Sequence, residues 1–184
     1  MRHTLLLFCV AALGLCRTPG AWAACQPLGP VTLGLRVIPG EMAAPGTTLE
    51  VALHANGCVR VQRPAHWRQA GHYTADSDAA LASLQARAGL DQRLASLDSQ
   101  ALLAALARRD QQRGAFFEVA DADLYTIDFR AADGRMHQFS MPALLQYAER
   151  HPDSAELAEL RDLVRTLSDQ ARRTDLTPVA ELPR

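Results

Sequence analysis

Residues 47–62 read TTLEVALHANGCVRVQ, two alternating apolar runs around an Ala-Asn-Gly turn, and this is the pattern of a β-hairpin. A two-residue turn would set Leu53 opposite Arg60 and mix an apolar face with a polar one. A three-residue loop sets Leu53 opposite Val59 and gives Gly57 the left-handed backbone that such loops need. Because a slip of one residue would expose the whole apolar set, the sequence predicts the three-residue loop.

Residues 125–141 repeat this pattern around an Ala-Asp-Gly turn that ends at Gly134. The same loop length pairs Phe129 with His137 and keeps the apolar residues on one face. Residues 30–38 also alternate and predict one further strand. Two Ala-Asx-Gly hairpins and a separate strand indicate an antiparallel sheet of about four or five strands, with one covered and one open face.

Helical periodicity predicts the elements that cover the sheet. The first helix is expected to begin at Asp76 or Ser77 and to stop at Gly89. Three later helices are expected from Asp98 or Ser99 to about Gly114, from Pro142 to His151, and from a capping box of Asp153 and Glu156 to Ala171. The predicted fold class is α+β, with helices packed on one face of the sheet.

The first 23 residues have the order of a secretory signal peptide. A basic start precedes an apolar run over residues 4–15, and Ala21-Trp22-Ala23 offers small residues where signal peptidase reads them. The run is shorter than the roughly 20 residues that span a bilayer, so no transmembrane segment is predicted. We expect a signal peptide over 1–23, one periplasmic or secreted domain over 24–173, and a frayed tail over 174–184.

The charge pattern excludes one class of partner. All 19 basic residues are arginine, a bias typical of a GC-rich bacterial genome. Removal of residues 1–23 takes away two arginines and no acid, so the net charge moves from −1 to −3. Such a chain has no overall positive potential that would attract nucleic acid.

The hydrophobic fraction of 48% is enough to build a core without help from a metal. No cofactor is predicted.

Cys25 and Cys58 are the cysteines that remain after the expected cleavage. An even number in an oxidising compartment favours a disulfide bridge. Cys58 lies on the more polar face of the first hairpin, where a strap from the N-terminus can cross the sheet. Two alternatives stay open. Cys25 can carry a lipid, although Trp22 replaces the usual aliphatic residue, or both cysteines can bind a metal with His54, although the spacing matches no zinc pattern.

The candidate binding residues lie in and beside one loop-like run after the first hairpin. They are Arg60, Arg63, His66, Trp67, Arg68, His72 and Tyr73. Aromatic and arginine side chains dominate binding hot spots, and loops on rigid sheets often carry function. The competing interpretation is that Trp67 and Tyr73 fill the end of the core while the arginines are solvated at its rim.

Catalytic and metal-binding motifs are absent from the sequence. It has no Gly-x-Ser-x-Gly elbow and no glycine-rich phosphate loop, so an enzyme is the less favoured interpretation. Asp121 and Asp123 lack the glycine and glutamate of a calcium loop and are interpreted as turn and capping acids. His66 and His72 are spaced for neither helix nor strand coordination of one ion. The enzymatic alternative is a small periplasmic hydrolase that uses these histidines with nearby acids.

Three stretches carry a resemblance in their order along the chain: Gly57-Cys58-Val59-Arg60-Val61, Ala70-Gly71-His72-Tyr73-Thr74 and Ala120-Asp121-Ala122-Asp123-Leu124-Tyr125-Thr126-Ile127. Over about residues 47–168 the chain resembles an uncharacterised family of bacterial secreted and lipoprotein domains, a domain of unknown function. It departs from that family in lacking a start of the Cys-Phe-Gly-x-Cys-Pro type. The resemblance implies no activity, cofactor or site residue.

These features favour a secreted or periplasmic binding protein without catalytic activity. The expected recognition surface is the open sheet face together with the 66–73 loop, which would engage a protein partner. A lipid-anchored envelope factor is the remaining alternative, and it differs only in the fate of Cys25.

Overall fold

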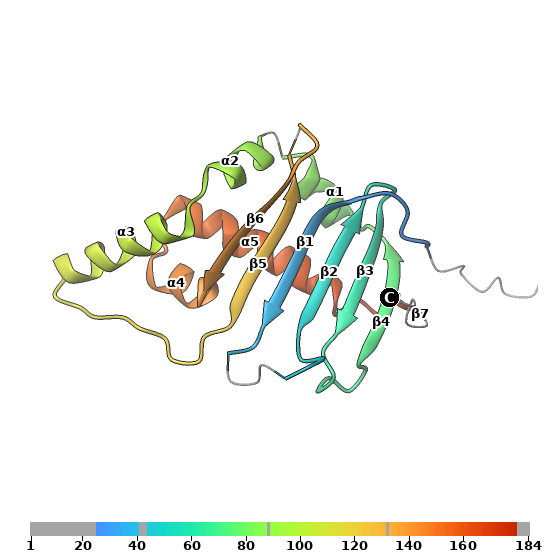
Figure 1. The fold of residues 1–184 in the computed structure, drawn as a ribbon, viewed down its shortest axis with the longest axis horizontal. Coiled ribbons are helices and arrows are strands. Elements are labelled where there is room, and N and C mark those ends of the chain that lie inside the picture. The colour runs from blue at the N-terminus through green and yellow to red at the C-terminus, as the bar shows by residue number, and fades with distance from the viewer. Residues whose placement is uncertain (1–24, 41–43, 88, 132, 180–184) are drawn as a thin grey trace, which may run out of the picture.

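The computed structural model describes residues 25–40, 44–87, 89–131 and 133–179. The predicted signal peptide and the last five residues lie outside this range. The described chain forms an α+β fold built on one antiparallel sheet of seven strands, in the order β6-β5-β1-β2-β3-β4-β7 (Figure 1). The strands are β1 (Val31–Ile38), β2 (Leu49–His54), β3 (Cys58–Arg63), β4 (Gly71–Asp76), β5 (Leu124–Arg130), β6 (Met136–Pro142) and β7 (Thr177–Val179).

Both predicted hairpin registers are confirmed. In the first hairpin Leu53 lies opposite Val59, and in the second Phe129 lies opposite His137. Gly57 has φ 81° and Gly134 has φ 82°, so both glycines adopt the left-handed backbone that a three-residue loop requires. The local alternation of apolar and polar residues was therefore sufficient to predict which residues of the two strands lie opposite each other.

The prediction of four or five strands is wrong, because the sheet has two more at one edge. β4 lies in a segment that the sequence suggested was a loop, and β7 lies in the segment expected to be a frayed tail. Only Tyr73 and Ala75 of β4 face the core, which is too weak an apolar pattern to identify a strand. β7 contains Pro178, which lacks an N–H group and is tolerated at a sheet edge.

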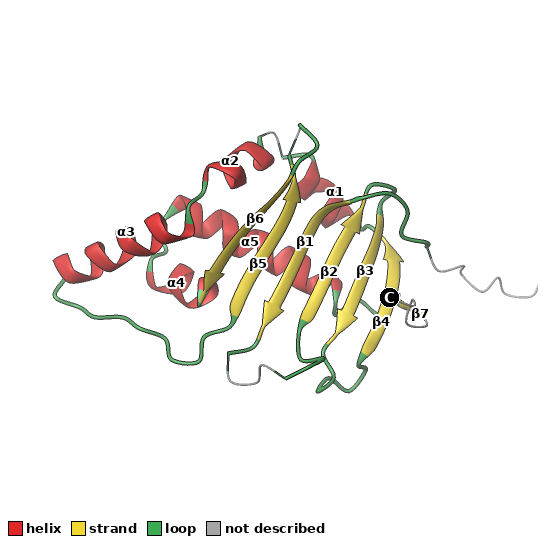
Figure 2. Cartoon of the chain, in the orientation of Figure 1, coloured by secondary structure: helices red, strands yellow, loops and turns green. Residues whose placement is uncertain are grey.

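The helices are α1 (Ala79–Gln85), α2 (Leu90–Ser96), α3 (Ser99–Gln112), α4 (Leu144–Arg150) and α5 (Ala155–Gln170). α5 crosses behind the sheet and contacts β1 and β2 (Figures 1 and 2). The sequence missed α2 and misplaced two caps. Asp78 caps α1 in place of Asp76 or Ser77, and Ser154 caps α5 in place of Asp153, because each side chain accepts the N–H three residues ahead.

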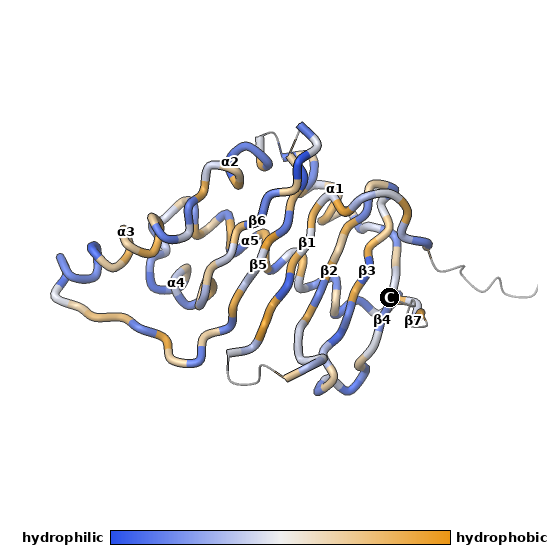
Figure 3. The backbone as a smooth tube through the Cα atoms, viewed as in Figure 1, coloured by the Kyte–Doolittle hydropathy of each residue, from blue (hydrophilic) through white to orange (hydrophobic). Residues whose placement is uncertain are grey.

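One apolar core joins the sheet to the helices. Alternate residues of the central strands face α5, and Figure 3 shows hydrophobic stretches along β1, β3 and β5. Leu53, Ile127 and Leu160 have no exposed surface. Among the described residues, no helix combines the length and apolar character needed to cross a membrane.

The predicted Cys25–Cys58 disulfide is present, with the two Cα atoms 5.8 Å apart. It fastens the N-terminal segment across the end of the β2–β3 hairpin, where Asn56 Nδ2 also donates a hydrogen bond of 2.7 Å to the Gln26 carbonyl. Ala55 N donates to the Pro30 carbonyl at 3.0 Å. The same Ala-Asn-Gly turn that sets the hairpin register therefore also holds the start of the domain.

Candidate functional site

The seven predicted binding residues do not form one surface. Arg60 and His72 lie on the open face of the sheet, on neighbouring strands. Arg63 and Tyr73 lie on the opposite, helix-covered face, and Trp67 is half-buried against the core. The two that remain, His66 and Arg68, are exposed in the turn between β3 and β4. Strand alternation divides the set, because successive residues of a strand point to opposite faces.

Arg63 is the most constrained of these residues, with 7% of its surface exposed. Its Nε donates to the Ala171 carbonyl at 2.8 Å and its Nη2 to the Arg173 carbonyl at 3.2 Å. Nη1 donates to Gln69 Oε1 at 2.7 Å. The first two bonds satisfy carbonyls at and just beyond the C-terminal end of α5, where an unpaired carbonyl would otherwise be left in the interior.

The positive charge of Arg63 has no carboxylate partner in the part of the chain that the structure describes. Its contacts are two carbonyls, one amide oxygen and the ring of Tyr73, whose centroid lies 4.4 Å from the guanidinium carbon. The helix C-terminus offers a partial negative charge, and the ring face offers its quadrupole. Neither the helix end nor the ring carries a full negative charge, so the positive charge of the buried Arg63 guanidinium is only partly compensated.

A hollow of about 460 Å³ lies beside Arg63 and is called here the Arg63 pocket. Gln69 and Tyr73 line it from the β3–β4 side. Arg172, Arg173 and Thr174 line it from the segment after α5, and Leu176 and Pro178 complete it. No acidic residue is among these lining residues, whereas three are arginines. The lining is therefore cationic with a small apolar part, although Asp175 and Asp169 lie beside Arg173 and Arg172 outside the lining.

Arg172 and Arg173, which follow α5, differ in how firmly a neighbouring carboxylate holds their side chains. Arg173 is held at 2.6 Å by Asp175, and this contact raises the pKa of Arg173 and lowers that of Asp175. Arg172 lies 3.6 Å from Asp169, but 72% of its side chain is exposed, so this pair is loosely held in water. α5 ends at Gln170, and Arg173 folds back onto β4, where its Nη1 donates a hydrogen bond of 2.7 Å to the Asp76 carbonyl.

Asp78 links the start of α1 to the end of α5 near this pocket. Its Oδ2 accepts a hydrogen bond of 2.9 Å from Gln170 Nε2, and its Oδ1 accepts the Leu81 N–H. Burial opposes ionisation of Asp78, but these hydrogen bonds and the charge of Arg173 outweigh it and lower its pKa. Gln170 Oε1 in turn accepts a hydrogen bond of 2.9 Å from Arg173 Nη1, so Gln170 connects Asp78 to Arg173.

A second polar cluster is buried between α3 and α4. Arg150 Nε lies 3.1 and 3.2 Å from the two carboxylate oxygens of Asp110, and this hydrogen bonding lowers the Asp110 pKa. His151 Nε2 lies 3.4 Å from the same carboxylate, and the ring stacks on Tyr147. His151 has no exposed surface, so no substrate reaches its ring in this conformation. The cluster therefore joins α3 to α4.

The residues proposed for a hydrolase are not assembled into a catalytic centre. His66 is exposed in a turn, while His72 projects from the open face of β4 beside Gln62. In the described ranges, no group of three or more His, Cys, Asp or Glu side chains is arranged to hold a metal ion. Asp121 adopts φ 50°, a backbone conformation typical of a turn residue.

Comparison with known proteins finds no family model that matches the chain and no curated protein that is measurably similar to it. The resemblance to an uncharacterised family of secreted domains therefore stays a prediction.

Proposed function

We propose that this chain is a periplasmic or secreted binding protein without catalytic activity, which recognises an anionic group of a protein partner at the Arg63 pocket. The observation that carries the proposal is a buried guanidinium that has no carboxylate partner among the described residues and lies at the wall of a cavity that Arg172 and Arg173 also line. Buried charges are normally paired, so an unpaired one beside an accessible hollow favours an external counter-ion.

Arg63 has donors left to bind such a group. A guanidinium carries five N–H donors, and three of those of Arg63 are engaged by Ala171, Gln69 and Arg173. Two donors therefore lack an acceptor among the described residues. A carboxylate that accepts them would form charge-assisted hydrogen bonds, which are about twice as strong as neutral ones.

The surroundings of the pocket favour a protein ligand over a free ion. Leu176 and Pro178 give the rim an apolar part, and the exposed turn residues His66 and Arg68 precede Gln69 in the chain. An acidic side chain or a chain-terminal carboxylate, flanked by apolar residues, matches this combination. Arg60 and His72 face the other side of the sheet and are not needed for this contact.

The disulfide supports the extracytoplasmic part of the proposal, because such bridges persist in oxidising compartments. The lipid-anchored alternative would share this pocket and differ only at Cys25. The hydrolase alternative has no comparable observation in its favour, since His66 and His72 project from different parts of the β3–β4 hairpin.

The test uses an acetylated peptide that ends in a free carboxylate and the same peptide with an amidated end. We expect the free carboxylate to shift the amide resonances around Gln69 and Arg172, and the amidated form to leave them unchanged. Arg172→Glu should abolish the shift, because it places a like charge at the pocket mouth. Arg165→Glu, at an exposed position on α5, is the matched control.

Arg63→Gln provides a second variant that removes the buried charge but retains hydrogen-bonding capacity. It should weaken carboxylate binding even when the variant remains folded by circular dichroism. Equal shifts with the two peptides, or an effect of Arg165→Glu as large as that of Arg172→Glu, would contradict the proposal.

A further inference from the structure

The two edge strands of the sheet differ in how they are protected. β7, at one edge, has three residues and contains Pro178. β6, at the other edge, has seven residues, no Asp, Glu or Arg, and no proline before its last residue, Pro142. A short strand, a proline or a charged side chain usually guards an exposed edge, because unpaired backbone groups attract further strands. The edge at β6 has none of these guards before Pro142.

The hydrogen bonds at the two ends of the β5–β6 ladder show which backbone groups of β6 are used by β5. At one end Ala131 N donates to the Arg135 carbonyl at 2.9 Å, and at the other Ala143 N donates to the Asp123 carbonyl at 2.9 Å. Hydrogen-bonded and non-hydrogen-bonded pairs alternate along an antiparallel ladder. The residues of β6 that bond to β5 are therefore His137, Phe139 and Met141.

The intervening residues of β6 direct their backbone N–H and C=O groups away from β5. They are Met136, Gln138 and Ser140. These three N–H donors and three carbonyl acceptors have no hydrogen-bond partner in the part of the chain that the structure describes. Met136 and Gln138 are exposed, so solvent reaches this row of groups. Another extended backbone supplies donors and acceptors at the same alternating spacing.

The helices determine what fits beside this edge. α2 and α3 contact β6, and in Figures 1 and 2 both continue past it on the side away from β5. A single added strand would lie over this continuation of the helix layer. A second copy of the chain would bring its own helices into the same layer, where α2 and α3 already lie. The arrangement therefore favours one extended segment over a second sheet.

We infer that the outer edge of β6 binds an extended segment of a partner protein, which adds to the sheet as one more antiparallel strand. All strand pairs of the described sheet are antiparallel, so this orientation continues the existing ladder. β6 offers no counter-charge, so the segment that fits is uncharged over its paired residues. Its side chains that face α2 and α3 are apolar. The edge lies at the opposite end of the sheet from the Arg63 pocket, so the two sites are independent.

The probe is the peptide acetyl-Thr-Val-Thr-Val-Thr-Val-Thr-amide, which has no charge and alternates as the inference requires. With the valines toward the helices and antiparallel pairing, the threonine N–H groups meet β6 and the valine N–H groups point away. A version that is N-methylated on the valines therefore keeps the pairing edge. A version that is N-methylated on the inner threonines loses it. Neither peptide carries a carboxylate for the Arg63 pocket.

The experiment measures amide hydrogen exchange of the disulfide-bonded protein by NMR with each peptide at millimolar concentration. The valine-methylated peptide should slow exchange of the Met136, Gln138 and Ser140 amides by about tenfold, because they become hydrogen-bonded. It should leave Phe139 unchanged, because that amide is already bonded to β5. The threonine-methylated peptide should change none of them.

Gln138→Pro removes one outward N–H group and no bond of the β5–β6 ladder, and should weaken binding about tenfold. Gln138→Thr keeps the N–H group and is the matched control. Both variants lose the side-chain bond of 2.8 Å to Asp128, so their difference reports the backbone. Unchanged protection of the Phe139 amide shows that the proline variant is folded, and the two peptides decide the question on the unaltered protein in any case.

Three results would each overturn the inference. They are equal effects of the two peptides, no slowing by the valine-methylated peptide, and equal weakening by Gln138→Pro and Gln138→Thr. Outward amides already protected in a free protein that sediments as a dimer would overturn it too, because a second copy would then hold this edge.

Discussion

At the scale of single residues, two turn glycines carry much of the hairpin geometry. Gly57 and Gly134 adopt φ 81° and 82°, which side chains other than glycine rarely accept. Their three-residue loops keep the apolar residues of each hairpin on one face. Both positions were identified from the sequence, because a loop one residue shorter would have mixed the faces.

Gly134→Val should destabilise the domain by about 1–3 kcal/mol, because a β-branched residue is strained at this φ. Apart from the adjacent residues of the chain, no described atom lies within 4 Å of the position that a Cβ would occupy, so the loss comes from the backbone and not from a clash. Urea denaturation measures it. Gly34→Ala, at a strand position without positive φ, is the control and should change stability by much less. Equal losses at both positions would contradict this assignment.

Trp67 is the residue for which the binding and packing interpretations differ most. It is half-buried against the core, so Trp67→Ala should cost about 1–3 kcal/mol in apolar burial. Thermal denaturation tests this, with exposed Arg68→Ala as a neighbour expected to change stability by about 0.5 kcal/mol at most. A Trp67→Ala protein of unchanged stability would favour the recognition interpretation instead.

At the scale of elements, the Asp110–Arg150 contact joins α3 to α4 across a long sequence separation. α3 has only Leu106 and Asp110 buried, so few apolar contacts hold it in place. The sequence predicted both helices but not this contact, because nothing local to either helix indicates which polar residue will be buried. The ion pair exists only once the helices have packed.

Asp110→Asn should lower the melting temperature at pH 7, where the native carboxylate is ionised and bonded to Arg150. The pKa of Asp110 is lowered in the folded protein, so its stabilisation is present above its ordinary value of 3.8 and is lost as the pH falls below that value. The difference between wild type and variant should therefore shrink from pH 7 to pH 3. A difference that does not change with pH would show that the lost interaction is not ionic.

At the scale of the whole molecule, the Cys25–Cys58 bridge links the start of the domain to the sheet, with a sequence separation of 33. A loop of this size should stabilise the fold by roughly 3–4 kcal/mol in the chain-entropy model. A Cys25→Ser, Cys58→Ser double variant should show this loss in urea denaturation. Reduced wild-type protein should match the variant, and an unchanged midpoint in both would contradict the expected role.

The intact mass of the exported protein tests the start of the domain independently. We expect cleavage before Ala24, with no lipid attached and a mass two hydrogens below that of the reduced chain. A lipid on Cys25 would instead identify an envelope-anchored protein and leave Cys58 without this bridge.

The sequence alone determined the α+β class, the pairing register of both hairpins and the cysteine pair. These features depend on local alternation, on turn chemistry and on the number of cysteines, all of which are present before the chain folds. It did not reveal α2, β4 or β7, whose residues show little periodicity. It also placed seven candidate binding residues together, although strand alternation sends Arg60 and His72 to one face of the sheet and Arg63 and Tyr73 to the other.

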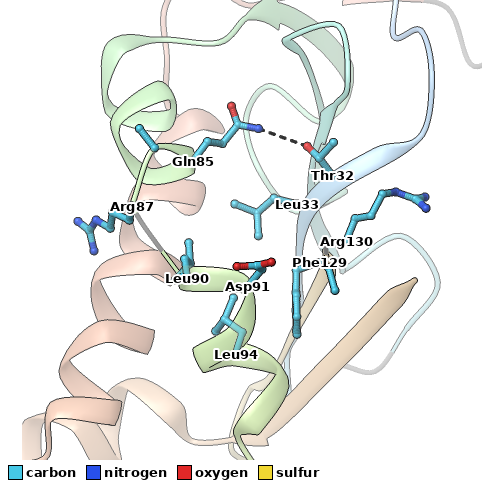
Figure 4. A pocket seen from close by; sticks show the side chains of 12 residues that line it. Thr32, Leu33, Gln85, Arg87, Leu90, Asp91, Leu94, Phe129 and Arg130 are labelled. Atoms are coloured by element: carbon cyan, nitrogen blue, oxygen red, sulfur yellow. Dashed lines mark hydrogen bonds between the residues drawn. The ribbon is translucent and has the colours of Figure 1, made fainter. Parts of the chain in front are cut away.

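Only the tertiary structure decided which of these residues bounds a cavity. Arg63 became notable because the end of α5 returns to β3, burying its guanidinium beside Arg172 and Arg173 from the far end of the chain. The hollow that Gln85, Leu33 and Phe129 line likewise needs the ends of α1 and β5 to meet beside the start of β1 (Figure 4). Such sites depend on contacts between segments that are far apart in the sequence. Which segments meet is decided by the packing of the whole core, and no local sequence pattern reveals it.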